Sequence, residues 1–259
     1  MRTLHSLALA ALVLLTGCYT SPISGKRSVI LSSSSGDVEL GLIPYQQILG
    51  EERIITSGPE EAMVQRVASR LVDVVQRDNL EPAKFEWEVA LLDNDQVANA
   101  FCLPGGKMAV YTGILPVTQS ETGLAVVMGH EIAHALARHG ASRVSQQTLK
   151  QLALQATVIF APDTPALKEL ADSLTETLVL RPNGRGDELE ADEIGLILMA
   201  RAGYDPREAV EFWGRMAAGS SGAPPEFLST HPSHETRVDE LTALMPRAMA
   251  EYEAARGGL

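Results

Sequence analysis

The 259-residue sequence has few cysteines, few basic residues and no long apolar run, and each shortage narrows the class of protein. Only Cys18 and Cys102 are present, so a small scaffold held together by several disulfides is excluded. The 21 Lys and Arg face 33 Asp and Glu, a formal net charge of −12, and no stretch concentrates the basic residues. We therefore expect no nucleic-acid partner. After residue 18, no apolar run approaches the roughly 20 residues that a membrane-spanning helix needs.

The amino terminus is predicted to be a lipoprotein signal peptide covering residues 1–17. It carries one arginine, then an apolar run from Leu7 to Leu15, which is too short to span a bilayer. The ending Leu-Thr-Gly-Cys resembles the lipobox of bacterial lipoproteins, in which the cysteine is acylated and becomes the mature amino terminus. Cys18 is therefore the predicted lipid anchor, which leaves no disulfide. Tyr19, where an aspartate would retain the protein in the inner membrane, favours the outer membrane. The alternative is an ordinary secretory signal that ends near a cysteine by chance.

The rest of the chain is predicted to form a flexible tether followed by one domain. Residues 18–44 are rich in serine and glycine, which is typical of a tether. Residues 45–259 contain 10-to-20-residue stretches with helical spacing and two short alternating stretches, so we predict an α+β domain that is mainly helical with a small sheet. The predicted helices are Glu60–Arg77, Glu121–Arg138, Ser142–Phe160, Pro165–Leu178 and Asp187–Arg201, and the predicted strands are Phe85–Leu92 and Lys107–Tyr111.

The segment His130-Glu131-Ile132-Ala133-His134 predicts a metal site. Two histidines four residues apart on a helix project from one face, about 40° apart, so both imidazoles can bind one zinc ion. Glu131 is placed to act as a general base toward a water molecule on that metal. The alternative is a pair of core histidines that bond to the backbone. A catalytic zinc takes three protein ligands, so a third is needed elsewhere.

His139 is a poor third ligand, because it lies about 140° round the helix from His134. We expect a supporting or structural role for it. A better candidate is the acidic stretch that contains Glu188 and Asp192, which share one helical face. One of these carboxylates would bind the metal, and the other would accept the N–H of a ligating histidine. The alternative is an acidic first turn that complements the helix dipole.

Several ordered motifs resemble the M48 group of zinc metallopeptidases, which includes prenyl-protein proteases and bacterial periplasmic lipoproteins. They are HEIAHALARH, then DELEADEIG, then STHPSHETR at Ser229–Arg237, preceded by NAFCLPGGKMAVYTGIL at Asn99–Leu115. The resemblance covers roughly residues 45–246. It implies a gluzincin-type metallopeptidase fold with a small antiparallel or mixed sheet beside the active-site helix, and one zinc ion per chain.

The resemblance also implies roles for individual residues. Glu188, rather than Glu190, corresponds to the third zinc ligand, and Asp192 to its supporting partner. His231 corresponds to a histidine near the metal that stabilises the oxyanion or blocks the water site. Arg237 and Arg185 match positions near the active site, and Lys107–Tyr111 matches the edge strand on which a peptide substrate would lie.

The resulting hypothesis is a zinc-dependent endopeptidase, anchored by lipid in the bacterial envelope and facing the periplasm. Its expected substrates are misfolded, stalled or misassembled envelope polypeptides. Two alternatives stay open. One is a latent or non-proteolytic zinc-containing assembly factor for outer-membrane proteins, in which His231 fills the fourth metal position. The other is a secreted peptidase without a lipid anchor, which mass spectrometry of the mature amino terminus would distinguish.

Overall fold

The computed structural model describes residues 18–155, 176–180, 183–218, 226–231 and 236–257. The predicted signal peptide and most of the predicted helix Pro165–Leu178 lie outside these residues. The longer helices are α2 (Gly36–Glu51), α3 (Pro59–Arg77), α5 (Glu121–Leu136), α6 (His139–Gln155), α8 (Arg185–Arg201), α9 (Arg207–Ala218) and α11 (Arg237–Gly257). Shorter helical segments are η1 (Thr112–Ile114), α4 (Leu115–Thr118), η2 (Glu176–Leu180) and α10 (Glu226–Thr230). The prediction of a mainly helical α+β domain is confirmed. In the described part of the chain, no helix is both long enough and apolar enough to cross a bilayer.

A four-stranded mixed sheet lies beside the helices. Its strands are β3 (Ile54–Ile55), β4 (Glu88–Leu92), β5 (Ala100–Leu103) and β6 (Lys107–Tyr111), in the spatial order β3-β4-β6-β5. Strands β4 and β6 are parallel, and the other pairs are antiparallel. The prediction that Lys107–Tyr111 is the edge strand is wrong, because β6 pairs on both sides and β5 lies at the edge. The sequence shows which segments are strands, but their order in the sheet depends on pairing between distant segments.

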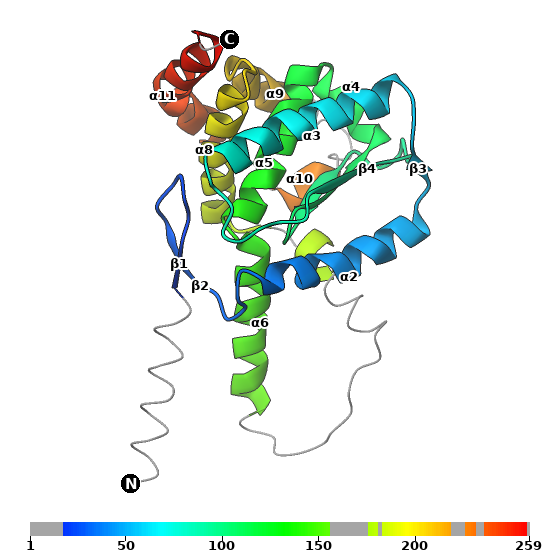
Figure 1. Ribbon diagram of the computed structural model, residues 1–259, viewed down its shortest axis with the longest axis vertical. Helices are drawn as coiled ribbons and strands as arrows, with labels where there is room; N and C mark the ends of the chain where they lie inside the picture. The colour runs from blue at the N-terminus through cyan, green and yellow to red at the C-terminus, as the bar shows by residue number, and fades with distance from the viewer. Residues whose placement is uncertain (1–17, 156–175, 181–182, 219–225, 232–235, 258–259) are drawn as a thin grey trace.

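Helix α5 is the centre of the domain. It runs between α8 and the sheet, where it contacts β5 (Figure 1). Fourteen of its residues are buried, from Gly123 to Leu136. Ser120 ends the preceding loop, and its Oγ accepts a hydrogen bond from the backbone N–H of Gly123 at 3.0 Å, which fixes the start of the helix. Any polar side chain between Gly123 and Leu136 is therefore held in the core and needs a partner there.

Helices α5 and α8 approach closely because each has a glycine at the crossing. A Cβ atom built on Gly195 would lie 2.9 Å from the backbone N of His130 and 2.9 Å from the carbonyl carbon of Gly129. Both distances are shorter than a side chain tolerates. The glycine pair thus lets the acidic face of α8 lie directly against the histidine face of α5.

Gly195→Ala is expected to destabilise the protein and to disturb the site that the two helices share. The added methyl must push α8 away from α5, and overpacking of this kind costs about 1–3 kcal/mol. Urea titration measures the free energy of unfolding. Gly214→Ala is the matched control, because a Cβ at that helical position meets nothing within 4 Å. It is expected to stabilise by up to about 1 kcal/mol through helix propensity. Equal effects of the two substitutions would contradict the close crossing.

The prediction that residues 18–44 form a flexible tether is wrong. They contain the antiparallel hairpin of β1 (Cys18–Thr20) and β2 (Arg27–Val29) and the first half of α2. Asp37 is buried and accepts hydrogen bonds from Arg138 Nε and Nη2 at 2.6 and 2.9 Å. The serine and glycine content of the segment describes only its local tendency. Its order comes from partners about a hundred residues further along the chain.

Candidate active site

Helix α5 carries three buried polar side chains on the face toward α8 and α10. His130, Glu131 and His134 are 2, 4 and 6% exposed. Buried polar groups of this kind are normally paired or bind an ion. The structure brings the predicted residues of α8 to this face, because Glu188, at 0% exposed, lies against both histidines. The predicted set His130, His134 and Glu188 therefore forms one cluster.

The donor atoms of these three residues converge. His130 Nε2 and His134 Nε2 are 3.1 Å apart. The two carboxylate oxygens of Glu188 lie 3.3 Å from them, Oε2 from His130 Nε2 and Oε1 from His134 Nε2. Donors bound tetrahedrally to a metal at 2.0–2.1 Å would be about 3.4 Å apart. The residues therefore fit a metal ion of this size.

His231 follows α10 and supplies a fourth donor. Its Nδ1 lies 3.2 Å from His130 Nε2 and 3.1 Å from Glu188 Oε1, while its Nε2 lies 3.3 Å from Glu131 Oε1. The donor atoms of His130, His134, Glu188 and His231 all lie within 4.8 Å of one another. The ring is fixed from behind by Phe227, which stacks on it with 4.6 Å between centroids. His231 thus stands where a fourth ligand would be.

A buried carboxylate and arginine support the first histidine. Asp192 Oδ1 lies 3.0 Å from His130 Nδ1, so this nitrogen carries the proton and Nε2 is free to bind. Arg237 donates from Nη2 to Asp192 Oδ1 at 2.6 Å and to Glu188 Oε2 at 3.2 Å. Its guanidinium also stacks 3.4 Å above the Trp213 ring. Nothing in the sequence pattern indicated that Trp213 belongs to the site.

The second histidine is supported differently. His134 Nδ1 lies 2.8 Å from His139 Nδ1, and His139 Nε2 lies 3.1 Å from Glu190 Oε2. His139 is therefore outside the group of four donors and contacts one of them from behind. Arg185, in contrast, donates to Thr236 Oγ1 at 3.1 Å on the surface of the molecule.

The electrostatics favour a positive charge at the centre of the cluster. Burial would lower the pKa of His130, but the charge of Glu188 and the hydrogen bond to Asp192 outweigh it and raise the pKa to about 9. Burial would raise the pKa of Glu188, yet its contacts with His130, His134 and His231 hold it far below the usual range. Burial lowers the pKa of His134 well below its ordinary value, so its ring stays neutral, the form that binds a metal.

Burial raises the pKa of Glu131, and the nearby His231 and His130 offset part of this effect. A carboxylate with a raised pKa takes up a proton more readily than an ordinary one near neutral pH. Glu131 also lines the pocket in front of the histidines. It is thus in a position to exchange protons with a molecule in that pocket.

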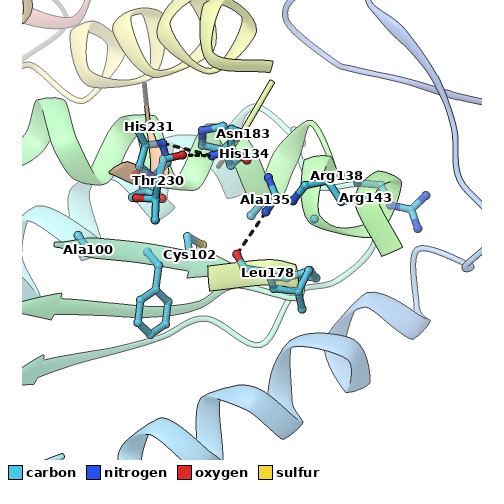
Figure 2. Close-up of a pocket in the computed structure, with 14 residues that line it drawn as sticks. Ala100, Cys102, His134, Ala135, Arg138, Arg143, Leu178, Asn183, Thr230 and His231 are labelled. Carbon is cyan, nitrogen blue, oxygen red and sulfur yellow. Dashed lines mark hydrogen bonds and ion pairs between the residues drawn. The ribbon is translucent and has the colours of Figure 1, made fainter. Parts of the chain in front are cut away.

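A small cleft of about 30 Å³ lies in front of the donors, between α5 and the edge strand. Figure 2 shows His134 and His231 across the cleft from Ala100 and Cys102 of β5. Asn183 and Thr230 border it near His231, and Leu178 lies along its floor. Of the four donor residues, His134 and His231 line this pocket, together with Glu131.

Two histidines and a glutamate around one position, with a second glutamate beside them on the same helix, define a metallopeptidase site. Comparison with known families agrees. Residues 59–245 match the model of peptidase family M48, and the chain belongs to this family. The protein is a metalloendopeptidase.

The relatives that it matches include mitochondrial metalloendopeptidases and a bacterial protease. The chain is 35% identical over 240 residues to "Mitochondrial metalloendopeptidase OMA1" of Schizosaccharomyces pombe, covering 90% of this chain and 68% of that protein. It is 33% identical over 247 residues to human "Metalloendopeptidase OMA1, mitochondrial", covering 90% of this chain and 47% of that protein. It is 28% identical over 230 residues to the "Beta-barrel assembly-enhancing protease" of Escherichia coli, covering 85% of this chain and 46% of that protein.

Proposed function

We propose that the metal is zinc, held by His130, His134 and Glu188, and that Glu131 is the general base for peptide hydrolysis. The observation that carries this proposal is the convergence of these donors within 3.1–3.3 Å of one another beside Glu131. Imidazole and carboxylate ligands in a tetrahedral arrangement suit zinc. When bound, zinc activates a water molecule and polarises the carbonyl of the scissile bond.

The protein's own residues then manage the protons and the substrate. Glu131 accepts a proton from the attacking water and delivers it to the nitrogen of the leaving amine. Among the described residues, β5 has a strand partner on one side alone, so an extended peptide would pair with its other side and bring the scissile bond in front of Glu131. Asp192 and Arg237 hold His130 and Glu188 in position throughout.

We further propose that the substrates are unfolded or misassembled polypeptides of the bacterial envelope. A strand edge recognises backbone rather than particular side chains, and a folded protein does not present an extended segment to it. The Leu-Thr-Gly-Cys sequence before Tyr19 supports a lipid anchor at Cys18, facing the periplasm from the outer membrane. The name of the E. coli relative refers to β-barrel assembly, which supports the same compartment.

A paired assay tests the substrate proposal. Full-length protein, extracted from membranes in detergent and loaded with zinc, is incubated with one disulfide-containing protein in its native form and in its reduced, alkylated form. Cleavage is expected for the unfolded form alone. Equal cleavage of both forms, or of neither, would contradict the proposal. Mass spectrometry of the amino terminus tests the anchor, which requires an acylated Cys18.

A second candidate is a latent peptidase in which His231 blocks the metal. The distances of 3.1 and 3.2 Å from His231 Nδ1 to Glu188 and His130 support it, because they bring this nitrogen as close to the other donors as a fourth ligand would be. A water molecule would need the same place. If His231 instead stabilises the oxyanion, it would turn toward the substrate and donate a hydrogen bond to the carbonyl oxygen of the scissile bond.

His231→Ala separates the two roles. We expect a higher initial rate of cleavage than in the parent, because the fourth position is open from the start. Rates are compared at equal zinc content on the unfolded substrate. A loss of about 10²–10³ in kcat would instead assign His231 to the oxyanion. The control is Arg185→Gln on the surface, which is expected to leave the rate of cleavage unchanged. His139→Gln would not serve, because His139 contacts the donor His134.

A further inference from the structure

We propose that His139 and Glu190 position the metal-facing ring of His134, and that the amino-terminal hairpin β1–β2 completes this support through Ser24 and Lys26. The proposal rests on the metal-binding role of His134 given above. It assigns to the hairpin a part in the metal site, although the hairpin lies more than a hundred residues before it in the sequence.

The direction of each hydrogen bond follows from the metal-binding nitrogen. His134 Nε2 faces the other donors, at 3.1 Å from His130 Nε2, so it must carry a lone pair. A neutral imidazole then has its proton on Nδ1. This Nδ1–H donates to His139 Nδ1 at 2.8 Å, which leaves the His139 proton on Nε2. That proton is donated to Glu190 Oε2 at 3.1 Å. Two hydrogen bonds in series therefore fix the orientation and the protonated nitrogen of His134.

The two ligating histidines are supported in parallel ways. His130 reaches its carboxylate, Asp192, directly at 3.0 Å. His134 reaches Glu190 through the intervening ring of His139. Both carboxylates lie on α8, two residues apart, and both are buried. Partners of this kind typically contribute 10- to 100-fold to metal affinity.

Glu190 is held by the hairpin. Lys26 Nζ lies 3.0 Å from Glu190 Oε2 and 3.0 Å from Asp187 Oδ1, and it donates to the carbonyl of Gly186 at 3.3 Å. The hydroxyl of Ser24 donates to Glu190 Oε1. Both oxygens of Glu190 are thus occupied, one by His139 and Lys26 and the other by Ser24.

Lys26 also bears on whether the neighbouring cluster of His139, Asp187 and Glu190 could bind a second metal ion. His139, Asp187 and Glu190 have the residue types and spacing of a second metal site. The ammonium group of Lys26 bridges the two carboxylates and supplies the positive charge that a second cation would bring. The geometry therefore favours support of His134 over binding of another metal.

The hairpin contacts the helix of the donors as well. Tyr19 donates from its hydroxyl to the carbonyl of Leu136 at 2.5 Å, two residues after His134. The hairpin is thus attached to α5 through Tyr19 and to α8 through Lys26 and Ser24. It therefore joins the two helices that carry His130, His134 and Glu188.

Zinc affinity, measured on the full chain by competition with a chelator, tests the proposal independently of proteolysis. Glu190→Gln is expected to weaken zinc binding by about 10- to 100-fold. Lys26→Met, at a half-exposed position, is expected to weaken it by about two- to fivefold. Arg247→Met is the matched control. Arg247, on α11, pairs at 2.6 Å with Glu193, which lies on α8 as Glu190 does, and Arg247 touches none of the groups that support His134. It is expected to keep the parental affinity.

A spectroscopic signature separates positioning from general destabilisation. With cobalt in place of zinc, the visible d–d absorption reports the ligand geometry, and it is expected to shift in Glu190→Gln and not in Arg247→Met. His139→Leu is expected to lose zinc affinity, and His139→Gln to restore part of it, because an amide can accept from His134 and donate to Glu190.

Parental zinc affinity and an unchanged cobalt spectrum in both Glu190→Gln and Lys26→Met would overturn the proposal, whether or not the His139 variants fold. Failure of the proposed proteolytic function would give a different result: the unmodified protein would bind zinc tightly but cleave no substrate.

Discussion

Replacement of Glu131 by glutamine is expected to reduce kcat for peptide hydrolysis by about 10²–10⁴-fold, the usual contribution of a general base. The amide has the shape of the carboxylate but cannot accept the proton of the attacking water. Glu131 is not among the converging donors, so the variant should retain its zinc. The measurement is the single-turnover rate on an unfolded substrate, with the zinc content of the same sample determined by elemental analysis.

Glu121→Gln is the matched control for this variant. Glu121 lies at the start of the same helix, where it contacts Arg66 and Tyr204 at 3.0 Å, far along α5 from the donors. Its substitution is expected to leave kcat unchanged. A zinc-loaded Glu131→Gln protein that hydrolysed peptides at the parental rate would rule out the assigned base.

Arg237→Met is expected to destabilise the protein by about 3–5 kcal/mol, because it leaves buried carboxylates without their cation. Arg237 is 1% exposed and donates to both Glu188 and Asp192, which are 0 and 5% exposed. The loss should be greatest in protein stripped of metal, since a bound cation compensates Glu188. Urea unfolding with and without zinc measures both values.

Arg201→Met provides the comparison. Arg201 also bridges two carboxylates, Glu251 at 2.7 Å and Asp78 at 3.1 Å, but its side chain is 25% exposed. Solvent screens these pairs, so the expected loss is about 1 kcal/mol or less. If the two arginine variants lost the same free energy of unfolding, the claim that Arg237 compensates the buried charges of Glu188 and Asp192 would be disproved.

The parts of the site that the sequence predicted are those that depend on local spacing. His130 and His134 share a face because they lie four residues apart on one helix, and Glu188 and Asp192 share a face of α8 for the same reason. Which carboxylate meets which histidine depends on how the two helices cross. That crossing depends on Gly195, whose role no periodicity reveals.

The parts that were mispredicted depend on distant pairing. The composition of residues 18–44 predicts a tether, because it cannot show that Asp37 pairs with the distant, buried Arg138. The alternating residues of Lys107–Tyr111 predict a strand, but they do not show that β5 pairs with it, so its position inside the sheet is not predicted. The sequence offers Glu188 and Glu190 as alternatives, whereas in the structure Glu188 contacts His130, His134 and His231, and Glu190 contacts His139.

The amino-terminal hairpin has a practical consequence for recombinant production. A processing cut immediately before Cys18 leaves both strands whole, whereas an expression boundary placed after Val29, inside the segment that composition predicts to be a flexible tether, removes Ser24 and Lys26. Such a product would still contain every donor residue, yet it would hold its metal less tightly during purification. The choice of first residue therefore bears on the specific activity of a preparation.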